Sequence, residues 1–481
     1  MQHSGDMDPE DFRRAGHQLI DWIADYLADP ARYPVLSRVH PGEIAAALPA
    51  TAPVDGEPFD TIFADFERVL VPGLTHWNHP GFLAYFAITG SAPGVLAETL
   101  SAALNVQAML WRTSPSATEL EEVTLGWLRK LLGLPDTFEG VIYDTASIST
   151  LHALAAARER HVPGVRTQGL AGRSDLPRVR VYCSDQTHSS IDKAVIALGF
   201  GQESLRKIES DQDYRMKPDA LARAIASDRS AGWLPIAAVA TVGTTSSTSV
   251  DPVKAIAEVC RNEAIWLHVD AAYAGVAAMV PGYEWVLDGA EQADSLVVNP
   301  HKWLFTQFDL SAFYTPHMDL VRAAFALTPE YLKTAEAAPV KNLMDTGIQL
   351  GRRFRALKLW MVLRHFGADG LRARLAEHMR LARQFAEWVD ASAAFERVAP
   401  VPFSVVCFRA HPRGLPEDAV DALNERLLES INQTGEIFIS HTKLMGRFTL
   451  RLAIGNLRTT ERHVARAWEL LQLHAAQLAK S

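Results

Sequence analysis

Between about residue 90 and residue 320 the chain repeats one unit, which is a short apolar run, a polar turn and a helix-like stretch. Three of these mainly apolar runs are Val141–Tyr143, Val179–Cys183 and Ile236–Val242, and each leads directly into Ser, Thr, Asp or Gly residues. Such runs are typical of strands buried on both faces of a parallel sheet. Because the strands alternate with helices, the pattern predicts an α/β domain with a mainly parallel sheet and helices on both faces.

Two further runs end near a charged residue. Ile265–Val269 is followed by Asp270, and Ser295–Val298 leads into Asn299-Pro300-His301-Lys302. Ligand-binding groups collect at the carboxyl ends of the strands in open α/β sheets. A lysine that can bond to an aldehyde and a carboxylate that keeps a pyridine nitrogen protonated suit pyridoxal phosphate (PLP). Taken alone, the lysine also fits a solvated loop and the aspartate a helix N-cap.

Other strand ends bring polar groups to the same edge of the sheet. Ala146 and Ser147 open a predicted helix, where free backbone N–H groups attract phosphate, although a serine there also fits a plain N-cap. His188 follows the strand that ends at Cys183, and it suits either stacking on a cofactor ring or ordinary packing. Thr245 could reach the cofactor, and ordinary turn chemistry also explains it.

The two flanks of the α/β pattern differ from it. The spacing of apolar residues between positions 8 and 80 predicts three amphipathic helices. Their apolar faces need either the core or a second subunit to cover them. A long helix is expected at about 350–366. Beyond it, Val405–Phe408 and Phe448–Ile454 are predicted strands of a smaller α+β domain.

Composition excludes several classes of protein. The chain has 481 residues, a net charge of −9 and no long basic run, so a nucleic-acid partner is not expected. No uninterrupted apolar run reaches about 18 residues, so no membrane span is expected. Cys183, Cys260 and Cys407 lack metal-ligand spacing, which predicts free thiols and no metal site. The polar N-terminus lacks a signal core, and the cytoplasm is the expected location.

Several motifs together resemble one enzyme family. The chain resembles the group II PLP-dependent amino-acid decarboxylases, in particular their aromatic-L-amino-acid decarboxylase branch. The resemblance extends from about residue 8 to 470. The motifs that carry it are Ser114–Pro115 with Thr118–Glu121, Asp185–Ser190, His268–Gly275, Asn299–Leu304 and Leu350–Arg355.

The resemblance implies a fold and a domain division. The expected fold is that of type I PLP-dependent transferases, similar to aspartate aminotransferase. Residues 1–85 would form a helical dimerisation segment, 86–370 the large PLP-binding domain and 371–481 the small C-terminal α+β domain. The implied assembly is a homodimer.

The resemblance also implies roles for individual residues. Lys302 matches the lysine that binds the cofactor covalently, Asp270 the partner of the pyridinium nitrogen and His188 the histidine stacked on the ring, and these three are the expected catalytic residues. The other expected cofactor contacts are Ala146, Ser147, Thr245, Ala272, Asn299 and His301.

The substrate pocket is less constrained by the sequence. Trp77, Tyr85 and Trp111 could line it, although core packing explains them equally well. Thr89 follows Phe86-Ala87-Ile88, where relatives place a threonine in an aromatic-Pro-Thr stretch. Gly351 matches a position at which glycine leaves room for large rings.

The last expectation concerns a loop between residues 328 and 347, which we expect to be a mobile lid. Relatives carry in this loop a tyrosine that gives a proton to the substrate, and counting back from Gly351 places that position at Leu343. Leucine cannot donate a proton, so an aldehyde synthase that decarboxylates and oxidatively deaminates its substrate is the main alternative. The favoured function is decarboxylation of an L-amino acid such as Trp, Tyr, Dopa or Phe to its amine. An aminotransferase and a non-catalytic PLP-fold protein are weaker alternatives.

Overall fold

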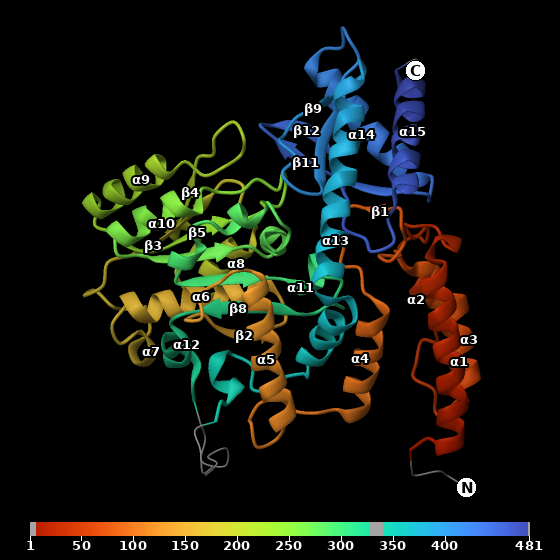
Figure 1. Ribbon diagram of the computed structural model, residues 1–481, viewed down its shortest axis with the longest axis horizontal. Helices are drawn as coiled ribbons and strands as arrows, with labels where there is room; N and C mark the ends of the chain where they lie inside the picture. Colours follow the sequence, from red (N-terminus) through yellow and green to blue (C-terminus); the bar gives the residue numbers. More distant parts are fainter. Residues whose placement is uncertain (1–5, 328–339, 480–481) are drawn as a thin grey trace.

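The computed structural model describes residues 6–327 and 340–479, and it has an N-terminal helical arm, a large α/β domain and a smaller C-terminal α+β part (Figure 1). The large domain contains a seven-stranded sheet with the strand order β2-β8-β7-β6-β5-β3-β4. Strand β8 runs antiparallel to both of its neighbours, and the remaining pairs are parallel. The strands are β2 (Glu139–Tyr143), β3 (Val179–Ser184), β4 (Leu205–Ile208), β5 (Leu234–Thr241), β6 (Trp266–Asp270), β7 (Ser295–Val298) and β8 (Ser311–Thr315).

Helices cover both faces of this sheet, as the sequence predicted. Within β3, Tyr182 packs into the core on one face, and Val181 and Cys183 pack into the core on the other. Residues buried on both faces explain why the strands are nearly continuous apolar runs. One face is covered by α6 (Ala146–His161), α8 (Ser190–Ala197) and α12 (Met318–Phe325), and the other by α5 (Pro115–Leu131), α9 (Pro218–Ser230) and α10 (Val253–Asn262).

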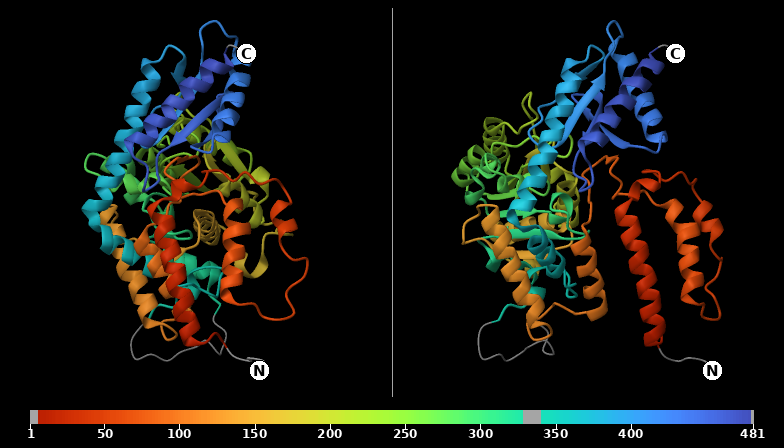
Figure 2. Two further views of the ribbon diagram at one scale, coloured as in Figure 1. Left: turned by 90° about the vertical axis from the view of Figure 1, so that its right-hand side faces the viewer. Right: turned by 45° about the vertical axis from the view of Figure 1, so that its right-hand side comes forward.

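The N-terminal arm stands beside the rest of the molecule (Figure 2, red). It contains α1 (Pro9–Ala28), α2 (Glu43–Ala47) and α3 (Phe59–Asp65). Trp22 holds α1 to α3 by an edge-on contact with Phe63 at 6.2 Å between ring centroids. Much of the apolar surface of the arm stays open, since Phe12 is 67% and Ile62 51% exposed.

A stripe of exposed leucines lies on α4 (Ala92–Leu104) of the large domain. Leu96, Leu100 and Leu104 are 54%, 47% and 62% exposed, and their spacing of four residues places them on one face of the helix. The arm and α4 therefore both present unpartnered apolar faces in the single chain.

The C-terminal part has a five-stranded sheet with the order β1-β11-β12-β10-β9. Its members are β1 (Phe82–Leu83), β9 (Phe395–Arg397), β10 (Val405–Ala410), β11 (Phe438–Leu444) and β12 (Arg447–Ala453), with α14 (Glu417–Gln433) and α15 (Glu461–Leu478) beside them. Strand β1 joins the end of the N-terminal arm to this sheet by pairing parallel to β11.

Helix α13 (Ala356–Ala391) connects the large domain to the C-terminal part. It is longer than the expected helix at 350–366, and it breaks at Gly367, whose φ of 66° and ψ of 170° are not helical. Glycine tolerates this backbone conformation because it has no Cβ. The domain limits at residues 85 and 370 stay predictions. In the described part of the chain, no helix is long and apolar enough to cross a membrane.

Candidate active site

The predicted cofactor residues surround one cavity of about 190 Å³ at the carboxyl edge of the large sheet. The strands β5, β6 and β7 and the start of α6 deliver them, because all of these end or begin at this edge. The cavity is lined by Ala146, Ser147, His188, Thr245, Asp270, Ala272, Asn299, His301 and Lys302, together with Phe86, Thr145, Thr241, Gly243 and Tyr273. All nine residues that the sequence proposed as cofactor contacts are thus brought together.

Lys302 reaches the cavity from α11 (Pro300–Trp303), a single helical turn directly after β7. Its Nζ lies 5.2 Å from the centre of the Phe86 ring, and no hydrogen bond or ion pair is recorded for it among the described residues. Burial lowers the pKa of the Lys302 ammonium, and the carboxylate of Asp270 opposes this shift. A lowered pKa increases the fraction of free amine, which is the form that attacks an aldehyde.

Asp270 ends β6 and is 6% exposed. The backbone N–H of Ala272 donates to its Oδ1 at 3.1 Å, which fixes the side chain at the bottom of the cavity. Behind it, His268 is fully buried between Thr150 and Ser295, with its Nδ1 2.9 Å from the Ser295 hydroxyl. Burial lowers the pKa of His268 to about 4, so Asp270 has a neutral imidazole at its back.

The opposite end of the cavity offers donors for an anion. Helix α6 begins at Ala146, and its N-cap residue Thr145 makes no side-chain capping bond, so the first N–H groups of the helix have no side-chain cap. His301 accepts a hydrogen bond at Nδ1 from Leu310 N (2.8 Å), and burial lowers its pKa to about 3. The neutral ring therefore carries its proton on Nε2, 3.2 Å from the Asn299 amide.

The Asn299 Nδ2 atom lies 3.2 Å from His301 Nε2, and its Oδ1 is buried without a partner among the described residues. Because His301 Nε2 is itself a donor, we infer that the amide is turned over, with its oxygen on the ring and its NH₂ at the free position. A free buried donor beside the uncapped start of α6 is what a phosphate group requires. The lysine, the carboxylate and this anion-binding end fit PLP, and they would hold it with Lys302 at the aldehyde, Asp270 at the ring nitrogen and Ser147 and Asn299 at the phosphate.

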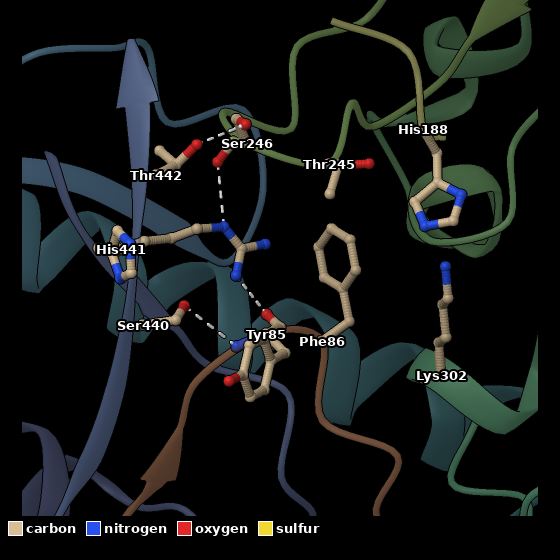
Figure 3. Close-up of a pocket in the computed structure, with 10 residues that line it drawn as sticks. Tyr85, Phe86, His188, Thr245, Ser246, Lys302, Ser440, His441 and Thr442 are labelled. Carbon is tan, nitrogen blue, oxygen red and sulfur yellow. Dashed lines mark hydrogen bonds between the residues drawn. The ribbon is translucent and has the colours of Figure 1, made fainter. Parts of the chain in front are cut away.

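His188 lies where this cavity meets a second one of about 320 Å³ (Figure 3). Its Nδ1 accepts from Ser190 N at 3.1 Å, which places the proton of the neutral ring on Nε2. Burial lowers the pKa of His188, Asp270 opposes that shift and Lys302 adds to it. In Figure 3, His188 and Lys302 point toward one another.

The second cavity contains a cation that the sequence analysis missed, Arg451 on β12. Arg451 is 3% exposed, its Nε donates to Ser246 O at 3.0 Å, and its Nη1 donates to Tyr85 O. Its guanidinium lies 4.6 Å from the centre of the Phe86 ring, and its Nη2 is buried without a partner within residues 6–327 and 340–479. A free buried guanidinium N–H is suited to binding a carboxylate. The remaining lining residues are Thr245, Ser440, His441 and Thr442 (Figure 3).

Of the six proposed substrate residues, Tyr85 lines the second cavity and the other five line neither cavity in the single chain. Trp77 stacks behind Tyr85 at 6.1 Å. Thr89 is fully buried, and its hydroxyl donates to Asn78 Oδ1 at 3.2 Å, so its contact with the substrate stays a prediction. Trp111 donates its indole N–H to Glu119 at 2.8 Å, and a Cβ at Gly351 would lie 3.3 Å from Gln107 Nε2.

Leu343 lies in the segment expected to form a lid. It begins a 3₁₀ turn (Leu343–Thr346), is 4% exposed and packs into the core around α6 and α12. Its match to the tyrosine position of relatives stays a prediction, and a leucine at that position cannot donate a proton. Residues 328–339 of the expected lid lie outside the described residues.

No group of three or more His, Cys, Asp or Glu side chains within residues 6–327 and 340–479 could hold a metal ion. The three cysteines are free and buried.

Comparisons with known proteins agree with this site. The pyridoxal-dependent decarboxylase conserved domain matches residues 41–411. Tryptophan decarboxylase 2 of Oryza sativa subsp. japonica is 41% identical over 98% of this chain and 96% of the rice protein. A phenylacetaldehyde synthase of Arabidopsis thaliana is 42% identical over 98% of this chain and 97% of its own length.

Solved structures show the same likeness. The crystal structure of Oryza sativa TDC with PLP and tryptamine matches with a TM-score of 0.94 at 37% identity, covering 98% of this chain and 99% of that one. The structure of Rhodiola rosea 4-hydroxyphenylacetaldehyde synthase matches with a TM-score of 0.91 at 34% identity, covering 98% and 99%.

The chain therefore belongs to the pyridoxal-dependent decarboxylase family. It is a PLP-dependent carboxy-lyase with the type I fold, as its motifs indicated.

Proposed function

We propose that this enzyme converts an aromatic L-amino acid to its amine and carbon dioxide. The observation that carries the proposal is the position of Lys302 between two cavities, one with Asp270 and a phosphate-binding end and the other with Phe86, Tyr85 and Arg451. Bound PLP would supply an aldehyde carbon for the substrate amine and a conjugated ring that accepts the electron pair released with carbon dioxide.

The residues of the chain would divide the work as follows. Asp270 would hold the proton on the ring nitrogen, and the buried site makes its negative charge effective. Lys302 would hold the cofactor through its Nζ between turnovers. His188 Nε2 carries a proton at the junction of the two cavities, where it can move to the substrate carbon.

The aromatic substrate class rests on the second cavity and on the relatives. Phe86 and Tyr85 provide aromatic surface there, and Arg451 provides a free donor for the α-carboxylate. Relatives that cover the whole chain are named tryptophan decarboxylase, tyrosine decarboxylase and phenylacetaldehyde synthase. All three names refer to aromatic substrates or products.

The choice of amine over aldehyde depends on proton delivery. Leu343 cannot donate a proton, so we propose His188 as the donor, because its Nε2 carries a proton where the two cavities meet. An aldehyde synthase stays the alternative, because a phenylacetaldehyde synthase is as similar to this chain as the decarboxylases are.

The test is an assay of the PLP-loaded enzyme with Trp, Tyr, Dopa and Phe in which carbon dioxide, amine, aldehyde and hydrogen peroxide are measured together. We expect amine equal to carbon dioxide, and a loss of roughly 10²–10⁴ in the rate of amine formation for His188→Asn. Peroxide equal to carbon dioxide from the wild type under air would make the aldehyde synthase the primary function. Turnover of non-aromatic amino acids alone would overturn the substrate class.

We also propose that the enzyme is a homodimer in the cytoplasm. Gly351 and Trp111 do not reach the cavities of their own chain, and the arm and α4 leave apolar faces open, so a second copy could complete the site and cover those faces. The three free thiols are consistent with a reducing compartment.

A further inference from the structure

A separate cavity of about 720 Å³ lies at the opposite edge of the large sheet from Lys302. It opens at the starts of β6 and β7 and beside the last residues of α6 and α10, whereas Asp270 and Asn299 follow from the other ends of the same strands. Its lining consists of Arg160, His161, Ala257, Cys260, Arg261, Ala264, Ile265, Leu267, Gln292 and Asp294. Its volume is in the range of small-molecule sites.

The charges of this cavity do not balance. Arg160 forms an ion pair with Asp294 at 2.6 Å, and His317 contacts the same carboxylate at 3.0 Å. Arg261 donates to the neutral Gln292 amide oxygen at 2.8 Å, and no ion pair is recorded for it in the described residues. Arg261 is therefore an uncompensated cation at the cavity, with guanidinium N–H groups left for a ligand.

The cavity lining contains a second polar group, the imidazole of His161. The Nε2 atom of His161 is buried and has no partner among the described residues. Burial lowers the pKa of His161, Arg160 and Arg229 add to this shift, and Asp294 opposes it. A neutral imidazole with a free ring nitrogen can donate a hydrogen bond to an anion.

The floor of the cavity is apolar. Ala257 and Cys260 of α10 face it together with Ile265 and Leu267 at the start of β6. An apolar floor beneath one free cation suits a ligand with a flat apolar body and a single negative charge.

We propose that this cavity is a binding site for a small aromatic monocarboxylate, with its carboxylate on Arg261 and His161 and its ring against Ala257, Cys260 and Leu267. The site is distinct from the decarboxylation centre, because β6 separates the two. A phosphate dianion fits less well. Asp294 already neutralises Arg160, and its carboxylate would repel the second negative charge of the phosphate.

The test is isothermal titration of the PLP-loaded enzyme with phenylacetate. We expect wild-type binding to weaken at least tenfold in Arg261→Glu, whereas decarboxylation by that variant stays at the wild-type rate. The matched control is Arg426→Glu on α14, an exposed arginine that undergoes the same change of charge in the C-terminal part and should bind like the wild type.

Three results would overturn the proposal. The first is no phenylacetate binding to the wild type at millimolar concentration. The second is binding that Arg261→Glu leaves unchanged, which would assign the ligand to the active site. The third is equal weakening by Arg261→Glu and Arg426→Glu, which would indicate a general charge effect. Tighter binding of inorganic phosphate than of phenylacetate would overturn the ligand class.

Discussion

At the scale of single residues, the catalytic candidates were accessible from the sequence because each follows a buried strand. Lys302, Asp270 and His188 all stand just beyond apolar runs, and parallel strands end at one edge. Arg451 was missed because it lies inside β12, where its contacts depend on how the C-terminal sheet packs against the loop at Ser246. The one signal in the sequence was a charged residue within a strand that is otherwise buried.

Replacing Lys302 should abolish both cofactor attachment and turnover. Lys302→Ala removes the amine that bonds to the aldehyde, so the visible absorption of the lysine-bound cofactor should disappear and carbon dioxide release should fall to background. Absorption spectra and carbon dioxide assays of the purified protein measure both effects. Lys443→Ala, which changes an exposed lysine on β11, is the control. An unchanged spectrum and rate in Lys302→Ala would rule out this residue as the attachment point.

Replacing Asp270 should weaken cofactor binding without unfolding the site. Asp270→Asn keeps the shape and the acceptor for Ala272 N but removes the charge facing the ring nitrogen. A hydrogen bond to a charged group contributes roughly 1.5–3 kcal/mol, so the Kd for PLP should rise roughly 10- to 150-fold. Equilibrium dialysis against PLP measures this change. Asp175→Asn, at an exposed residue, should leave the Kd unaltered, and an unaltered Kd in Asp270→Asn would contradict the assigned role.

At the scale of elements, the surroundings of Leu343 show what counting along a sequence leaves out. The position was found by counting back from Gly351 through a loop, and loops tolerate insertions and deletions. The burial of Leu343 in the core could not be seen from its apolar neighbours alone. The antiparallel strand β8 was likewise not distinguished, because an apolar run does not reveal the direction of its pairing.

Leu343 should therefore affect stability and leave the choice of product unchanged. Leu343→Ala removes a buried side chain from the core around α6, and such changes cost about 2–5 kcal/mol of unfolding free energy. Urea unfolding measures the loss, and the ratio of amine to aldehyde should equal that of the wild type. A changed product ratio with unchanged stability would return Leu343 to the active site.

The free energy of unfolding should depend on pH through Asp251, which follows the loop that carries Thr245. This buried carboxyl accepts from Met216 N, shortly before α9, at 2.7 Å and from Thr241 N, at the end of β5, at 2.8 Å. Burial raises its pKa from 3.8 to about 7. Between these two pKa values the folded state holds a proton that the unfolded chain has lost. The contribution of Asp251 to the free energy of unfolding is therefore complete below about pH 4 and is lost as pH rises through 7.

As pH rises from about 4 to 7, this one group lowers the free energy of unfolding by about 4 kcal/mol. Asp251→Asn, which does not titrate, should show a smaller fall in unfolding free energy between pH 5 and pH 8 than the wild type. Urea unfolding at several pH values, together with the rate of decarboxylation, measures the difference. Parallel stability curves for the two proteins would show that the carboxyl does not titrate in this range.

At the scale of the whole molecule, the sequence indicated a helical arm, a large α/β domain and a small C-terminal domain in that order. It did not indicate how these parts are arranged in space. The helical arm could be recognised from its spacing, whereas its separation from the large domain appears only in the structure (Figure 2). The same holds for Trp111 and Gly351, which were expected at the substrate pocket and yet lie outside the cavities of their own chain. Sequence reasoning treated the pocket as part of one chain, and a second copy was considered only for the arm.

The dimer can be tested on α4. Leu100 is 47% exposed in the middle of the leucine stripe, and Leu100→Asp would place a charge in a buried interface if two copies meet there. We expect light scattering at micromolar concentration to give the mass of two chains for the wild type and a shift toward one chain for Leu100→Asp, with activity lost in parallel. Leu473→Asp on α15, at a leucine of similar exposure (52%), should stay dimeric. A wild type that is monomeric and fully active would contradict the dimer. It would show that one chain forms a complete active site without Trp111 and Gly351 from a second copy.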